Sequence, residues 1–283
     1  MGGSNMKVIV TGSEGQLGTD VISELKNKGI EAVGADLPEL DITDAKAVEA
    51  FIASCKADAV IHCAAFTNVD LAESDKETCK KVNVCGTENI ALSCAKHGMK
   101  MLYLSTDYVF GGSGEEPFET DSATYPCNFY GETKLAGEKA VIASCDKHFI
   151  VRISWVFGEN GKNFVKTMLR LAETKDEITV VCDQTGSPTY TKDLAALLCE
   201  MIQSEKYGIY HATNEGFCSW AEFAAEIMKL SGAKTKIIPV TSSEYKSVAQ
   251  RPLNSRLSKA SIDEGGFGRL PHWQDALKRY LSK

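Results

Sequence analysis

The first half of the chain alternates short apolar runs with stretches whose apolar residues recur every three to four positions. Short apolar runs predict buried strands, and the three-to-four spacing predicts helices with one buried face. The predicted strands are residues 7–12, 30–36, 57–65, 100–106 and 148–158. The predicted helices are residues 18–29, 44–55, 75–98 and a segment that begins near Tyr130. This order predicts an α/β fold, a doubly wound parallel sheet of Rossmann type with helices on both faces.

After residue 158 the alternation becomes less regular. The pattern predicts amphipathic helices over residues 163–173 and 219–232 and strands over residues 178–183, 208–213 and 236–240. We expect a dinucleotide-binding domain and a smaller C-terminal α/β substrate-binding region. Their expected ranges are residues 6–158 and 159–283, with about 190–213 returning to the first domain. Residues 1–5 resemble the remnant of an expression tag, so that Met6 is the expected natural start.

Composition narrows the classes of protein that fit. The 283 residues are 43% hydrophobic and 24% charged, as in an average soluble globular protein. The net charge is −7 and no block of lysine and arginine occurs, which argues against nucleic acid as the main partner. No apolar run is long enough to span a membrane, and no signal peptide is visible. The ten cysteines lack Cys-x-x-Cys spacing, so we expect them to be reduced and mostly buried, as in a cytoplasmic protein.

A glycine-rich turn joins the first predicted strand to the first predicted helix. Its sequence, TGSEGQLG, places glycines at 12, 15 and 18. Such a turn lets the backbone approach a pyrophosphate, which then lies at the helix N-terminus. The alternative is a tight turn that binds no ligand. The cofactor contacts predicted in this turn are Gly12, Glu14, Gly15, Gln16, Leu17 and Gly18.

The second predicted strand ends at Asp36. A carboxylate there accepts hydrogen bonds from the adenosine ribose hydroxyls and repels a 2′-phosphate. Residues 37–45 contain no lysine or arginine to offset that repulsion, so we expect NADH use, or use of both NADH and NADPH. The other reading is a solvated strand end. Further predicted cofactor contacts beside it are Leu37, Asp41 and Ile42.

A tyrosine and a lysine, Tyr130 and Lys134, lie one turn apart on the helix that follows the fourth strand. The fourth strand ends in Ser105, Thr106 and Asp107, where a doubly wound sheet binds its ligands. A lysine ammonium would lower the pKa of the phenol, and the phenol would act as general acid on a carbonyl oxygen held by Thr106. We therefore predict Thr106, Tyr130 and Lys134 as catalytic residues, the last two also touching the cofactor.

Several motifs together resemble one family within the extended short-chain dehydrogenase/reductase superfamily. They are STDYVF, YGETKLAGE, RISWVFG, NFVKTMLRLA, DQTGSPTYTKDLA, RPLNSRL and LPHWQDAL, which run from the middle of the chain to near its end. The family is dTDP-4-dehydrorhamnose reductase. The resemblance implies reduction of the 4-keto group of dTDP-6-deoxy-L-lyxo-4-hexulose to give dTDP-L-rhamnose, with NADPH or NADH as the reductant.

The resemblance also implies further site residues. The segment HCAAFTNVDLAE resembles the family's loop after the third strand, with Cys63 in place of the usual asparagine. The implied cofactor contacts are Cys63, Ala64, Ala65, Thr67 and Asn83, and the implied substrate contacts are Val69, Thr106, Asp107, Trp155 and Arg251. Three of these have ordinary alternatives: a helix residue bonded to backbone for Asn83, a core position for Trp155, and a surface ion pair for Arg251.

Two other functions fit the same motifs. One is a different nucleotide-sugar reductase or epimerase on this scaffold. The other is a non-catalytic NAD(P)-binding protein, since the chain also resembles the regulatory subunit of methionine adenosyltransferase. The acidic residues have no spacing that marks a Mg²⁺ site, so a bound metal is left open. The oligomeric state is open as well, and a homodimer is one option.

Overall fold

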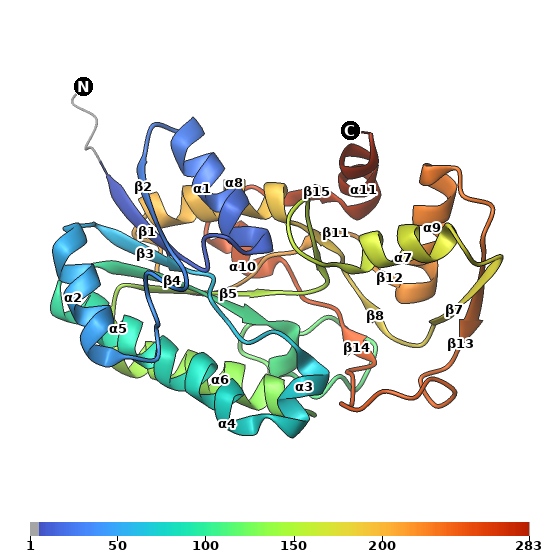
Figure 1. Cartoon of the computed structure of the whole chain (residues 1–283), viewed down its shortest axis with the longest axis horizontal. Helices are drawn as coiled ribbons and strands as arrows, with labels where there is room; N and C mark the ends of the chain where they lie inside the picture. The colour runs from blue at the N-terminus through green and yellow to red at the C-terminus, as the bar shows by residue number, and fades with distance from the viewer. Residues whose placement is uncertain (1–5, 283) are drawn as a thin grey trace.

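A six-stranded parallel sheet forms the centre of the computed structural model, which describes residues 6–282 (Figure 1). The expected tag, residues 1–5, lies outside this range. Across the sheet the strand order is β10-β5-β4-β3-β1-β2, and every pairing is parallel. The strands are β1 (Lys7–Thr11), β2 (Glu31–Ala35), β3 (Ala59–His62), β4 (Lys100–Thr106), β5 (His148–Ile153) and β10 (Gly208–His211). The predicted fold class is confirmed.

Helices cover both faces of the sheet. One face carries α1 (Gln16–Asn27), α8 (Thr191–Gln203) and the short α10 (Ala260–Glu264). The other carries α2 (Ala45–Cys55), α5 (Thr87–Lys96) and α6 (Phe129–Ser144). Successive side chains of a strand point to opposite faces. In β1, Val8 and Val10 therefore pack under α1 and α8, while Ile9 packs under the helices of the second face.

The helix predicted over residues 75–98 is interrupted. The structure has α3 (Val69–Ser74), α4 (Lys76–Lys80), a π-helical segment η1 (Lys81–Gly86) and then α5. Inside η1 the Asn83 amide is turned toward the loop after β3, where it accepts from Phe66 N at 2.8 Å and donates to Phe66 O at 3.1 Å. A π-helical turn re-aims one side chain within a continuing helix. Apolar periodicity does not reveal that change of register.

The strand predicted over residues 148–158 is also divided. β5 ends at Ile153, and a separate strand β6 (Val156–Phe157) pairs with β9 (Thr189–Tyr190). Between them Trp155 has a φ of +49°, in the left-handed region that few residues other than glycine adopt. The chain therefore turns away from the sheet at Trp155.

The C-terminal half of the chain forms most of a second lobe, whose hydrophobic core includes Phe223. Its larger elements are α7 (Phe164–Ala172), β7 (Glu177–Val181), α9 (Trp220–Ser231), β13 (Lys236–Val240) and α11 (Trp273–Leu281). Ser219 and Glu222 form a capping box that starts α9, and Gly232 ends the helix in a left-handed conformation. The remaining short elements are η2 (Asp107–Val109), β8 (Thr185–Gly186), β11 (Asn214–Glu215), β12 (Cys218–Ser219), β14 (Asn254–Ser255) and β15 (Leu270–His272).

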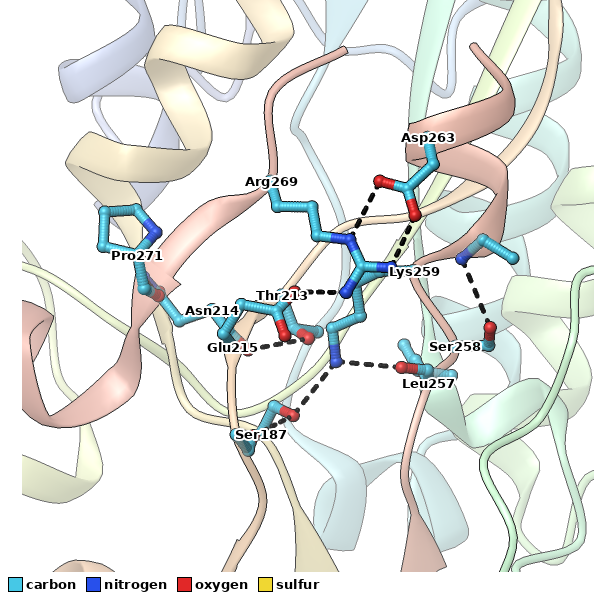
Figure 2. A network of polar contacts seen from close by, with 12 residues as sticks. Ser187, Thr213, Asn214, Glu215, Leu257, Ser258, Lys259, Asp263, Arg269 and Pro271 are labelled. Carbon is cyan, nitrogen blue, oxygen red and sulfur yellow. Dashed lines mark hydrogen bonds and ion pairs between the residues drawn. The ribbon is translucent and has the colours of Figure 1, made fainter. Parts of the chain in front are cut away.

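A polar network fixes the segment that returns from the second lobe to the sheet (Figure 2). Lys259 Nζ is buried and donates to Leu257 O at 2.9 Å and Ser187 Oγ at 3.4 Å. Burial lowers the pKa of Lys259 to about 8. Nearby, Arg269 pairs with Asp263 and Glu215. The network joins residues 254–272 to the strands around Ser187 and lies outside the cavity described below.

Three properties of the described chain bear on its class. None of the helices within residues 6–282 has the length and apolar character needed to cross a bilayer. Over the same range, histidine, cysteine and carboxylate side chains nowhere gather in a group of three that could hold a metal ion. All ten cysteines are free thiols. Cys182 and Cys85 are exposed, so the expectation of burial is wrong for these two; Cys182 stands just past the end of β7.

Candidate active site

A cavity of about 940 Å³ opens at the carboxyl ends of β1, β3 and β4, with its far wall supplied by the second lobe. Because β1 lies between β2 and β3, the strand order reverses there, which is where doubly wound sheets bind ligands. The predicted site residues that line this cavity are Gly12, Gly15, Gln16, Leu17, Asp36, Leu37, Asp41, Ile42, Cys63, Ala64, Ala65, Thr67, Val69, Thr106, Asp107, Tyr130, Lys134 and Trp155. Four predicted residues do not line the cavity: Glu14, Gly18, Asn83 and Arg251.

The glycine-rich turn has no room for side chains. Gly12 has a φ of +64°, and a Cβ there would lie 2.7 Å from Ala64 N. A Cβ on Gly18 would collide with Gly12 O. Gly15 is the N-cap of α1 and no side chain caps the helix, so backbone N–H groups of its first turn face the cavity mouth. This is a cradle that fits a diphosphate.

Asp36 is held against this turn by the backbone. Its Oδ2 accepts from Glu14 N at 3.1 Å and its Oδ1 accepts from Leu37 N at 3.0 Å. Glu14 thus acts through its main chain, while its side chain is exposed. Asp41 accepts from the hydroxyl and the N–H of Thr43, and these bonds lower the pKa of Asp41. Two carboxylates therefore line this end of the cavity.

The loop after β3 forms the floor near the turn. Cys63 stands in this floor, and burial raises the pKa of its thiol to about 12, so it is a neutral thiol. Asn83 does not line the cavity; its amide bonds to Phe66 and, at 3.0 Å, to Thr133 Oγ1. These contacts match the alternative interpretation of Asn83, a helix residue bonded to backbone. Asn83 joins the loop after β3 to α6.

Tyr130 stands in the first turn of α6. The helix begins at Asn128, whose Oδ1 accepts from Gly131 N at 2.9 Å. The Tyr130 ring packs edge-on against Tyr108, with ring centroids 5.7 Å apart. On the neighbouring strand end, Thr106 Oγ1 donates to Asp107 Oδ1 at 2.9 Å. These side chains line the same part of the cavity.

The acid–base character of this group differs from the sequence prediction. Burial and the nearby Asp107 carboxylate raise the pKa of Tyr130 well above its ordinary value, although the Thr106 hydroxyl acts in the opposite direction. The expected lowering is wrong because burial of the phenol has the largest effect on its pKa. Lys134 is also buried, 3% exposed, and burial lowers its own pKa to about 7. At neutral pH the phenol is protonated, as a proton donor must be.

A buried ion pair lies one turn further along α6. Glu138 accepts from Arg152 Nε at 2.9 Å and Arg152 Nη2 at 2.8 Å, and from Ser105 Oγ at 2.5 Å. Both charged side chains are almost fully buried, at 2% and 3% exposure. The Glu138 carboxylate raises the pKa of Lys134 and so partly offsets the effect of burial. Sequence reasoning missed this pair, whose partners are on α6 and β5.

Aromatic rings form the wall on the second-lobe side. Trp155 and Trp220 stack with centroids 3.7 Å apart and planes 14° apart, and Phe164 lies 4.5 Å from Trp220. A Cβ on Gly186 would lie 2.9 Å from Trp155 Cε2. Trp155 is therefore fixed in a slot despite its strained φ. All three rings line the cavity. No local sequence signal marks Trp220 or Phe164, because each belongs to an ordinary amphipathic helix.

Arg251 lies just outside the cavity. Its Nη2 donates to Asp70 Oδ2 at 3.0 Å, while Asp70 Oδ1 accepts from Ala249 N at 3.1 Å. Arg251 is therefore in an ion pair, which is the alternative considered for it. Its Nη1 atom is buried and has no hydrogen-bond partner in the described chain. Inside the cavity, Asp107 Oδ2 is likewise buried and unpaired, and burial raises the pKa of this carboxyl to about 6.

This chain is similar in sequence to known proteins over almost its whole length. Residues 6–283 match the family model described as RmlD substrate binding domain. The spore coat polysaccharide biosynthesis protein SpsK of Bacillus subtilis is 42% identical, over 98% of this chain and 97% of SpsK. The dTDP-4-dehydrorhamnose reductase of Aggregatibacter actinomycetemcomitans is 38% identical, over 96% and 97% of the two chains.

Solved structures give the same result. The dTDP-4-dehydrorhamnose reductase of Bacillus anthracis, in complex with NADP, is 39% identical and superposes with a TM-score of 0.96, covering 98% of this chain and 99% of that one. A dTDP-4-dehydrorhamnose reductase from Clostridium acetobutylicum has the same TM-score, with 40% identity and the same coverage. The chain belongs to the RmlD substrate binding domain family.

Proposed function

We propose that this protein is an NAD(P)H-dependent reductase that converts the 4-keto group of dTDP-6-deoxy-L-lyxo-4-hexulose to the alcohol of dTDP-L-rhamnose. One observation carries the proposal. Tyr130, Thr106 and Lys134 line the same cavity as the glycine-rich turn, in a chain whose full-length relatives include proteins named dTDP-4-dehydrorhamnose reductase. A proton donor and a cradle for a dinucleotide therefore share one enclosed space.

The residues around the turn fit a nicotinamide dinucleotide. The bare backbone at Gly12, Gly15 and Gly18 would hold the diphosphate at the start of α1, and Asp36 would hold the adenosine ribose. Lys134 would reach the nicotinamide ribose from α6. When bound, the cofactor supplies the hydride that reduces the carbonyl carbon.

The chain's own residues handle the proton and the charge. Tyr130, which is protonated at neutral pH, donates its phenolic proton to the carbonyl oxygen as that oxygen gains negative charge. Thr106 has a single hydroxyl proton, which now goes to Asp107. On binding substrate, Thr106 would donate to the carbonyl oxygen instead. Lys134, as an ammonium, stabilises the tyrosinate left behind.

Both walls of the cavity would contribute to specificity for the sugar nucleotide. Trp155 and Trp220 offer an apolar edge to a deoxysugar, and the unpaired Asp107 Oδ2 offers an acceptor for a sugar hydroxyl. A buried oxygen that accepts no hydrogen bond costs free energy. A sugar hydroxyl that donates to Asp107 Oδ2 therefore contributes more binding free energy than one that stays exposed to water.

The experiment is to mix the protein with NADPH and dTDP-6-deoxy-L-lyxo-4-hexulose and to follow cofactor oxidation and product identity. Parallel reactions contain dTDP-4-keto-6-deoxy-glucose, or omit the sugar. We expect oxidation with the first sugar to exceed that with the second, and dTDP-L-rhamnose as product. Oxidation with neither sugar, while NADPH still binds, would favour the non-catalytic binding protein. Interconversion of sugars without net oxidation would favour an epimerase.

A further inference from the structure

One loop of the second-lobe side approaches the glycine-rich turn directly. It comprises residues 158–163, between β6 and α7, and Gly161 and Lys162 of this loop line the cavity together with Gly12, Gly15 and Gln16. A Cβ on Gly161 would lie 3.4 Å from Gln16 Cβ, so the loop touches the first residue of α1. The phosphate cradle therefore has a cover that comes from outside the Rossmann-type sheet.

Hydrogen bonds fix this loop in place. Gln16 Nε2 donates to Val156 O at 3.3 Å, and Gln16 Oε1 accepts from Asn163 Nδ2 at 2.8 Å. Asn163 Nδ2 also donates to Gly158 O at 2.8 Å, which closes the loop on itself. The side chain that is the N-cap of α7 thus also joins α7 to the start of α1.

A second set of contacts holds the outer side of the loop. Lys166 Nζ donates to Glu159 O at 2.5 Å and Gly161 O at 2.9 Å, and the Glu159 carboxylate pairs with Lys192 Nζ at 2.7 Å. These bonds engage the backbone just before Lys162, and the bonds of Asn163 fix the residue just after it. The Lys162 side chain itself is exposed and has no hydrogen bond or ion pair within the described chain. A firmly held backbone thus carries one uncommitted lysine on the cavity lining.

The Lys162 ammonium matters because the cavity lining carries more negative than positive side chains. Among the described residues, the cavity lining contains three carboxylates, Asp36, Asp41 and Asp107, but only two cations, Lys134 and Lys162. Lys134 is buried beside Tyr130, where it lies 4.1 Å above the Tyr103 ring. The helix N-terminus contributes only partial charge to a bound diphosphate. Lys162 is the remaining full positive charge on the lining.

We propose that Lys162 binds the diphosphate of the nicotinamide cofactor, so that the loop of residues 158–163 clasps the cofactor against the start of α1. This inference rests on the proposed function, because it assumes that the glycine-rich turn holds a dinucleotide. It adds a cofactor-binding residue from beyond the sheet, through which the second-lobe side of the cavity takes part in holding the cofactor.

The position favours the diphosphate over the other phosphates that enter the cavity. Gly161 touches Gln16, which directly follows the N-cap Gly15, and the N-terminus of α1 is where the diphosphate lies. The 2′-phosphate of NADPH would instead lie beside Asp36, which the backbone N–H of Glu14 fixes at the end of β2. A diphosphate contact predicts equal losses for NADH and NADPH, whereas a 2′-phosphate contact predicts a loss for NADPH alone.

The test measures the Kd of NADH and of NADPH by the fluorescence of the bound nicotinamide, for wild type, Lys162→Met and Lys162→Arg. Loss of one charge-assisted bond to phosphate should weaken both cofactors by roughly five- to tenfold in Lys162→Met. Lys162→Arg should restore most of the affinity. The salt dependence of Kd should also be shallower in Lys162→Met, because one cation–phosphate attraction is gone. Lys175→Met, an exposed lysine outside the cavity, is the matched control and should behave as wild type.

Each other outcome has a definite meaning. Unchanged Kd values for both cofactors in Lys162→Met would overturn the inference, and so would a loss confined to NADPH. Unchanged cofactor binding with a raised KM for the sugar nucleotide would also overturn it, by assigning Lys162 to the other diphosphate. A wild-type protein that binds neither NADH nor NADPH would instead contradict the proposed function.

Discussion

On the sheet side of the cavity, the polar groups stand at strand ends and on α6, and most are buried and shifted in pKa. On the second-lobe side, the wall consists of stacked rings and one exposed lysine, Lys162. Burial shifts the acid–base groups of the sheet side: it raises the pKa of Tyr130 and lowers the pKa of Lys134 to about 7. The aromatic side has shape and area to recognise ligands, and among the described residues Lys162 is the one ionisable side chain that it adds to the lining.

This difference assigns separate tasks to the two sides. Changes on the sheet side should act mainly on kcat, because those groups interact with charge that develops during reaction. Changes on the second-lobe side should act mainly on KM or Kd, because those contacts are already made in the bound ground state. Each variant below tests that division.

The largest effect is expected for Tyr130→Phe. Removing the phenolic proton donor should lower kcat by about 10²-fold or more, the usual scale for general acid–base catalysis. Cofactor Kd should stay close to that of wild type, because the ring and its edge-on contact with Tyr108 are kept. Steady-state kinetics and cofactor titration measure the two quantities. A variant that keeps most of its turnover would remove Tyr130 from the chemistry.

Lys134→Met should lower kcat/KM by about tenfold or more, equivalent to about 1.4 kcal/mol of transition-state stabilisation. In wild type, kcat/KM should fall as pH rises above about 7, because the Lys134 amine becomes neutral there. That alkaline limb should be absent in the variant. A limb that persists unchanged in Lys134→Met would assign it to another group.

The same variant should be more stable than wild type at neutral pH. The folded pKa of Lys134 is about 7 against an ordinary 10.5, so between these values the unfolded chain binds the extra proton and stability rises with pH. Below pH 7 the buried charge costs most, and Met removes that cost. We expect a gain of roughly 1 kcal/mol or more at pH 6, since one pKa unit corresponds to about 1.4 kcal/mol. Thermal unfolding at several pH values measures it, and a destabilised variant would contradict the sign.

Trp220→Ala tests the second-lobe side. Loss of the stacked ring frees Trp155, and such aromatic pairs contribute about 0.5–1.5 kcal/mol, so KM for the sugar nucleotide should rise roughly two- to tenfold. The near-ultraviolet circular dichroism that arises from the two stacked indoles should be lost, while kcat changes little. Trp220→Phe is the matched control and should keep most of the affinity. A fall in kcat with unchanged KM would contradict the assignment of ligand binding to the second-lobe side and of chemistry to the sheet side.

The smallest effect is expected for Asp36→Ala. Removing the carboxylate removes repulsion for the 2′-phosphate and an acceptor for the ribose, so the kcat/KM ratio of NADPH to NADH should rise a few-fold. Wild type should accept NADH at least comparably to NADPH. A wild type that strongly prefers NADPH, with a ratio indifferent to the substitution, would place the Asp36 carboxylate away from the ribose.

The sequence predicted the sheet side well because its features are local. A glycine-rich turn between a strand and a helix, a strand ending at Thr106, and Tyr130 and Lys134 one helical turn apart each follow from short-range spacing. The parallel sheet then brings the strand ends to one edge. The pKa of Tyr130 was predicted in the wrong direction because it depends on how deeply Tyr130 itself is buried and on the Asp107 carboxylate, which helical spacing does not reveal.

The rest depends on contacts between distant parts of the chain. Trp220 meets Trp155 across 65 positions of sequence, and Gly161, next to Lys162, meets Gln16 although the two residues are far apart in the chain. The π-helical turn at Asn83 reflects a bond to the loop after β3, and the break at Trp155 reflects a slot beside Gly186. Hydrophobic periodicity carries no record of such contacts, so only the folded structure reveals them.

The most direct test of the central claim is to follow the hydride. NADPH carrying deuterium at the transferable position of nicotinamide C4 is incubated with the protein and dTDP-6-deoxy-L-lyxo-4-hexulose, and the product is examined by mass spectrometry and NMR. The account predicts dTDP-L-rhamnose with deuterium on sugar C4, formed at least about 10²-fold more slowly by Tyr130→Phe. Product without deuterium at C4, or label transfer that is equally fast without the Tyr130 phenol, would contradict it.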